Sequence, residues 1–126
     1  MNPRDELNSL IAEQWETTLG EDPLLATFTG DDRFNDRLPG MAEADMERRM
    51  AQARQFLGRW QAIDHDGLPA EDRLNYDIFG RLLHNDLQMM EYHAYRLPIS
   101  KAGGFHTYFP DLYLQVPLAT RRDHEN

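Results

Sequence analysis

Prolines divide this chain into segments, and the long segments between them carry the periodicity of a helix. All seven prolines fall at the boundaries of apolar patterns, and none lies inside a long periodic segment. Proline removes a backbone donor and clashes with the preceding turn, so it is tolerated at a helix start or beyond a helix end but not in the interior. The sequence contains no internal repeat and no low-complexity tract. The spacing therefore predicts an all-α fold in which proline-containing connections join a few long helices.

Three segments are predicted to form the long helices of a three-helix core. Residues 5–19 are amphipathic, with Pro3 near the start of the helix and Gly20 as its expected end. Residues 42–63 carry an apolar arc of about 140° opposite a charged face that we expect to be solvated. Residues 69–95 are apolar over roughly half of the circumference, which predicts a central helix. The apolar residues of the first helix are Leu7, Leu10, Ile11, Trp15 and Leu19, and those of the second are Met46, Met50, Ala53, Phe56, Leu57, Trp60 and Ile63. The charged face of the second helix holds Glu43, Glu47, Arg48, Arg49, Arg54 and Arg59. The apolar residues of the third helix are Leu74, Tyr76, Ile78, Phe79, Leu82, Leu83, Leu87, Met89 and Met90.

The connections are predicted to be irregular. Residues 21–40 begin with a short helical turn and are rich in turn-forming residues, yet their apolar side chains should pack on the domain. Residues 64–67 (Asp-His-Asp-Gly) favour a helix–helix turn over a calcium loop, because further alternating ligands and a distal Glu are lacking. Residues 97–106 predict an extended, glycine-hinged loop, and residues 107–117 a short helix or turn dense in aromatic side chains.

The last residues of the sequence predict the first turn of another helix. Thr120 is placed to accept from the backbone N–H of Asp123 while Asp123 accepts in return, a capping box with Asp in place of Glu. The following stretch, residues 121–126, is shorter than the roughly ten residues that a stable helix needs. We therefore expect residues 1–126 to be either a single helical domain or the N-terminal fragment of a longer one.

Composition limits the partners of the chain. The net charge of -9 opposes binding to nucleic acid or to an anionic membrane surface. No segment approaches the roughly twenty apolar residues of a membrane span, and the first residues lack the pattern of a signal peptide, so we expect a cytoplasmic protein. The absence of cysteine removes disulfides, thiolate zinc ligands and a thiol nucleophile.

Two sets of polar residues on the third predicted helix are candidate sites. The first set is Asp77, His84 and Glu91, in which each residue lies seven positions from the next, roughly 10.5 Å along the helix axis. Zinc ligands must lie within about 2.3 Å of the ion, so this spacing is too wide for one metal site. We expect these three residues to form a solvated face. A second set falls near one meridian within the apolar arc, where buried polar groups need partners. Either this set makes helix-to-helix or capping hydrogen bonds, or it faces a cleft completed by residues outside the chain. Its members are Asn75, Asp86 and His93.

The glycine-hinged loop offers a further candidate site. Gly103 and Gly104 lack the wider glycine spacing and the Lys-Ser/Thr of a phosphate loop. His106 beside Tyr108 has the chemistry for acid–base work, although a lone His among aromatic side chains is more often a packed, hydrogen-bonded residue. One hypothesis is therefore a small enzyme that uses His106 and Tyr108. Our prediction is instead that this chain contains no catalytic residue.

Several short motifs occur in a distinctive order. They are residues 22–27 (DPLLAT), 30–39 (GDDRFNDRLP), 68–77, 97–99 with Gly103 and Gly104, and 122–126 (RDHEN). In order and spacing they resemble the N-terminal region of the bacterial domain of unknown function 885 family. The resemblance spans nearly all of this chain but only the opening part of such a protein.

This resemblance implies a mainly helical zinc metallopeptidase with a His-Glu-x-x-His helix and a further acidic ligand downstream of the matched region. In that motif two histidines hold zinc and the Glu activates the bound water. No histidine of this chain precedes Glu-x-x-His, so no zinc ligand or catalytic base is carried over to His65, His84, His93, His106 or His124. Zinc and a peptide substrate would therefore belong only to the longer protein.

We therefore predict an N-terminal helical lobe that walls or lids a substrate cleft and is not catalytic alone. Residues 103–109 are the predicted cleft-facing piece, and the partner is the remainder of a longer chain or a second copy. The alternative is a stand-alone helical interaction or oligomerisation module, in which self-association buries the wide apolar arc of the third helix.

Overall fold

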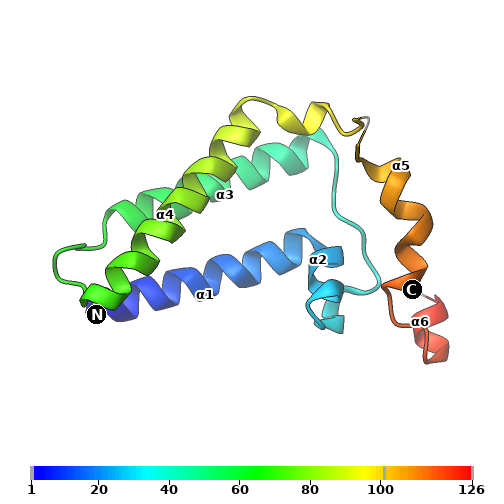
Figure 1. Cartoon of the computed structure of the whole chain (residues 1–126), viewed down its shortest axis with the longest axis horizontal. Coiled ribbons are helices and arrows are strands. Elements are labelled where there is room, and N and C mark those ends of the chain that lie inside the picture. Colours follow the sequence, from blue (N-terminus) through cyan, green and yellow to red (C-terminus); the bar gives the residue numbers. More distant parts are fainter. Residues whose placement is uncertain (1, 101, 126) are drawn as a thin grey trace.

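The computed structural model describes residues 2–100 and 102–125, and its regular elements are helical (Figure 1). The all-α prediction is confirmed. None of the described helices is long and apolar enough to cross a membrane. The α-helices and short 3-10 helices (η) are α1 (Pro3–Glu21), α2 (Pro23–Phe28), η1 (Asp32–Phe34), α3 (Glu43–Gln61), α4 (Ala70–Glu91), η2 (Ala94–Arg96), α5 (Phe105–Tyr108), η3 (Phe109–Leu114) and α6 (Arg121–Glu125).

The hydrophobic core lies where α1 packs against the α3–α4 hairpin, as the predicted three-helix core requires. The indole of Trp60 stacks on Tyr76 with ring centroids 4.6 Å apart, and its Nε1 donates to the Tyr76 carbonyl at 3.0 Å. Gly80 permits this approach, because a Cβ there would overlap the indole. The buried members of the core are Leu7, Leu10, Phe56, Ile63, Leu68, Tyr76, Phe79 and Leu83.

The helices diverge away from this core. Figure 1 shows α1 running apart from the α3–α4 hairpin toward α2, with α5, η3 and α6 alongside the open end. At the closed end the Arg4 guanidinium lies 3.2 Å from both Glu71 and Asp72, which ties α1 to the start of α4. At the open end Glu21 holds α1 to α3 by ion pairs with Arg48 and Arg49.

Two predicted helix ends are wrong. Gly20 does not end the first helix, which continues through Glu21, because Asp22 stops it by capping α2 through a hydrogen bond to the Leu25 N–H at 3.1 Å. The third long helix ends at Glu91 rather than at residue 95. There His93 takes the left-handed conformation with φ of 53°, which breaks the helix.

The burial of several side chains also differs from the prediction. Trp15 is 44% exposed, although the first helix was predicted to bury it. Arg49 belongs to the face predicted to be solvated, yet its side chain is only 17% exposed because it lies against Glu21. In the 21–40 connection Pro23 and Ala26 are buried as expected for a packed segment, whereas Phe28 and Leu38 remain exposed.

The C-terminal third is built from short elements. Ile99 and Gly104 form an isolated antiparallel bridge within the predicted loop, and the following helix begins at Phe105, two residues earlier than predicted. The predicted capping box is confirmed, because the Asp123 N–H donates to Thr120 Oγ1 at 3.2 Å and the Thr120 N–H donates to Asp123 Oδ2 at 2.7 Å. The predicted last turn reaches Asn126, which lies outside the described residues, as do Met1 and Lys101.

Candidate functional site

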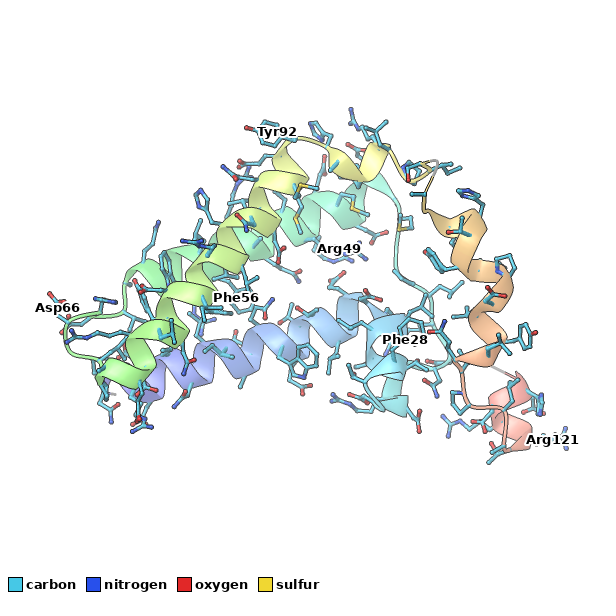
Figure 2. All side chains as sticks on the ribbon, viewed as in Figure 1. Phe28, Arg49, Phe56, Asp66, Tyr92 and Arg121 are labelled. Atoms are coloured by element: carbon cyan, nitrogen blue, oxygen red, sulfur yellow. The ribbon has the colours of Figure 1, made fainter. Side chains whose placement is uncertain are left out.

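A groove of about 390 Å³ lies between the diverging helices α1, α3 and α4. Its floor is apolar, with Phe56 from α3 and Leu83 and Met90 from α4. Figure 2 shows Phe56 and Arg49 on the side of α3 that faces α1. The volume falls within the range of small-molecule sites. The groove exists because α1 and the hairpin share the apolar core only near their closed end, whereas at the open end the ion pairs of Glu21 span the gap between α1 and α3. The polar and charged residues of the lining are Gln14, Thr17, Thr18, Glu21, Asp22, Arg49, Gln52 and Asp86.

Asp86 is the one residue of the predicted set Asn75, Asp86 and His93 that lines this groove. Partial burial raises the pKa of the Asp86 carboxyl above its ordinary value, although the residue as a whole is exposed. No described residue hydrogen-bonds or ion-pairs with this carboxylate. Asp86 is therefore a groove-lining carboxylate with no cationic partner in residues 2–100 and 102–125.

Arg49 and Glu21 close the open end of the groove. Arg49 Nε donates to Glu21 Oε2 at 3.0 Å, and Arg49 Nη2 donates to the Glu21 backbone carbonyl at 3.0 Å. Arg48 Nη2 approaches the same carboxylate at 2.9 Å. The hydrogen bonds of Arg48 and then of Arg49 lower the pKa of Glu21. No local sequence pattern predicts this pair, since only the fold brings residues 21 and 49 together.

Asn75 and His93 lie elsewhere. Asn75 is exposed on α4, and His93 follows the end of that helix, so the three residues do not share one helical meridian. The Nδ1 atom of His93 lies 2.9 Å from the Tyr95 hydroxyl, which in turn donates to Glu43 at 3.1 Å. Arg96 binds the same carboxylate at 2.7 Å, so this cluster fastens the chain after α4 to the start of α3.

The glycine loop is a tight turn. Ser100 donates its backbone N–H to the Gly103 carbonyl at 2.8 Å, and the Gly103 N–H donates to Ser100 Oγ at 3.1 Å. Gly104 has φ of 142°, and a Cβ there would lie 2.6 Å from the Pro98 carbonyl oxygen, whereas a Cβ on Gly103 would meet nothing within 4 Å. Glycine is therefore required at position 104 and not at position 103.

His106 and Tyr108 project from α5 and do not line the groove. Tyr108 packs edge-on against Phe105 with ring centroids 5.6 Å apart, and Phe105 also stacks on Phe109. No hydrogen bond joins His106 to another described residue. The arrangement gives His106 no orienting partner within the described chain, which general acid–base chemistry needs.

A second hollow of about 780 Å³ separates residues 24–38 from residues 109–123. Its polar side chains already have partners. Asn35 accepts from Thr27 at 2.7 Å and donates to Asp32 at 3.0 Å, and Asp123 is held by the α6 cap. This hollow brings Asn35 and Asp36 of the 30–39 motif close to Asp123 of the C-terminal motif.

The described residues do not fit a zinc ion. Within residues 2–100 and 102–125, no group of three or more His, Asp or Glu side chains is placed to hold a metal. Asp77, His84 and Glu91 are exposed and spread along α4, as their spacing predicts.

The fold and the groove define an all-α protein built on a three-helix core, with a groove of mixed polarity between diverging helices. A family model described as "Bacterial protein of unknown function (DUF885)" matches residues 23–126, and the chain belongs to this family. The match covers α2 to α6 and thus two of the three groove walls. No curated protein and no solved structure matches the chain.

Proposed function

We propose that this chain is a helical lobe that walls a peptide-binding cleft in a zinc metallopeptidase-like protein and has no catalysis of its own. Membership of the DUF885 family supports the proposal, together with the resemblance of the motifs to the N-terminal region of such proteins. The zinc site and the catalytic base belong to other parts of that protein in this proposal, and a cytoplasmic location is part of it.

The observation that carries the proposal is the apolar surface of the C-terminal third. Phe105, Phe109, Tyr113, Leu114 and Leu118 are all between 43% and 67% exposed, and they follow one another on α5, η3 and the segment after it. Large exposed apolar side chains concentrated on one segment in this way are typical of a contact surface. We assign it to the contact with the remainder of the metallopeptidase-like protein.

The first test is the native gene product in its own cell. We expect an intact mass well above that of the 126-residue chain, one equivalent of bound zinc and peptide hydrolysis, with neither zinc nor hydrolysis in the chain of residues 1–126 alone. A native mass equal to that of the 126-residue chain would contradict the proposal.

A substitution tests the contact surface. Phe109→Asp in the native product should lower peptide hydrolysis at least tenfold by separating the lobe from its neighbour, because a charge is costly in a buried apolar contact. Phe28→Asp is the matched control, since Phe28 is similarly exposed but lies on α2. Equal activity in the two variants would contradict the assignment.

A stand-alone oligomerisation module is the second candidate. The observation in its favour is a stripe of exposed apolar side chains on α4, which α1 and α3 leave uncovered.

A further inference from the structure

Helix α4 carries an apolar stripe that the rest of the described chain does not cover. Its exposed fractions run from 51% at Ile78 to 80% at Tyr92. The buried face of α4 is a separate row that points into the core. Figure 2 shows Tyr92, directly after α4, pointing away from the rest of the molecule. The large side chains of the stripe are Leu74, Ile78, Leu82, Met89 and Tyr92.

The stripe has the spacing of a two-helix seam. From Ile78 the steps of four, three, four and three residues reach Leu82, Asn85, Met89 and Tyr92. At 100° per residue these positions fall within about 80° of arc, which is narrow enough to face one partner helix. Asn85 is exposed and occupies the middle of the seam. A partner must therefore supply both apolar surface and a hydrogen-bonding group at the centre.

Two charged residues flank this seam and lack ion-pair partners among the described residues. Arg81 lies on one side of the seam and Asp86 on the other, five residues later. In a parallel pair of helices, residues with this spacing face each other across the seam. In an antiparallel pair centred on Asn85, the two Asp86 carboxylates would face each other instead.

We propose that α4 pairs in parallel and in register with α4 of a second copy of this chain. The two Asn85 amides then hydrogen-bond at the centre, since an amide both donates and accepts. Each Arg81 binds Asp86 of the other copy, which supplies a cation that Asp86 lacks among the described residues of its own chain. The inference does not rest on the lobe proposal, because it uses a different surface, and it gives the second candidate function its geometry.

Cysteine cross-linking tests the register, because the natural chain contains no cysteine. The variants Ile78→Cys and Asn85→Cys should each form disulfide-linked dimers on mild oxidation. His84→Cys is the control, since His84 is exposed on α4 but off the seam, and it should form no disulfide-linked dimer. Cross-linking of Ile78→Cys only when it is mixed with Tyr92→Cys would overturn the parallel arrangement.

Charge reversal tests the flanking pairs. Arg81→Asp and Asp86→Arg should each weaken dimerisation about tenfold in sedimentation velocity, because each places like charges opposite each other in both interchain pairs. The double variant should restore dimerisation, because opposite charges then face each other again in both pairs. Circular dichroism of each variant checks that the helices remain folded. A chain that stays monomeric at high concentration, or a double variant no better than the single ones, would overturn the inference and leave the lobe proposal standing.

Discussion

At the scale of single residues, Glu21 links the open ends of α1 and α3. Its pKa is lowered from the ordinary value of 4.5, chiefly by the hydrogen bond from Arg48 and further by Arg49. A group whose pKa is lower in the folded state stabilises the fold above its unfolded pKa and loses that contribution as the pH falls. Glu21 therefore supports the fold at neutral pH and less so below about pH 4.5.

Replacement of Glu21 by Gln tests the contribution of the Glu21 charge to stability. We expect Glu21→Gln to cost about 1 kcal/mol of unfolding free energy at pH 7, because Arg49 is left largely buried without its anion. The difference between the two proteins should shrink toward zero as denaturant melts are repeated at pH values from 5 down to 3. A difference that does not change with pH would contradict the role of the charge.

Asp72 is the buried charge of the closed end. The residue is 5% exposed, and Arg4 Nε lies 3.2 Å from its Oδ2 without the alignment of a hydrogen bond, so that atom has no hydrogen-bond partner among the described residues. Arg4 therefore stabilises Asp72 through its charge.

Removal of Arg4 should expose this dependence. We expect Arg4→Ala to destabilise the fold by about 2 kcal/mol, because a buried carboxylate loses its cation. Asp72→Asn added to Arg4→Ala should recover part of the loss, as measured by urea unfolding at pH 7. If the double variant is less stable than Arg4→Ala, the charge is not the cause.

At the scale of elements, replacing either of two glycines in the long helices by alanine should change the stability of the fold in opposite directions. Gly80→Ala should lower the free energy of unfolding by about 1–3 kcal/mol, because the new methyl group would overlap the Trp60 indole. Gly58→Ala in α3 should instead stabilise by up to about 1 kcal/mol, since nothing lies within 4 Å and alanine favours the helix. Thermal unfolding of both variants checks the pair, and a shift of the same sign in both would contradict the packing seen around Gly80.

The turn before α5 offers a second matched pair. Gly104→Ala should loosen it, because φ of 142° and the nearby Pro98 carbonyl exclude a side chain, whereas Gly103→Ala should be tolerated. Faster hydrogen exchange of the Thr107 amide, which donates to the Gly104 carbonyl, is the expected result for Gly104→Ala alone. Equal exchange in both variants would contradict this account.

At the scale of the whole molecule, two apolar surfaces remain uncovered by the described chain. One follows α4 and the other follows α5 and η3. The sequence predicted a wide apolar arc on the third helix, but it could not reveal which half of that arc the core takes. Tyr76, Phe79 and Leu83 pack inward, while Ile78 and Leu82 stay exposed, because α1 and α3 approach α4 from the same side.

The sequence predicted less of the candidate site. Asp86 was singled out because a carboxylate within an apolar arc is unusual, and it lines the groove. The ion pair of Glu21 with Arg49 was not predicted, because a charged residue on a helix face gives no sign of a partner 28 positions away. The cleft-facing role of Gly103, Gly104, His106 and Tyr108 stays a prediction.

The sequence by itself determined the helical class, the order of the helices and the capping of α6, because periodicity, proline and capping residues act within a few positions of the chain. Only the tertiary structure decided where α4 ends, which side of it is buried and where the groove opens. Those features depend on contacts between distant residues, such as Tyr95 and Arg96 with Glu43, and Arg49 with Glu21. No local pattern records such contacts, since they arise only when the helices pack.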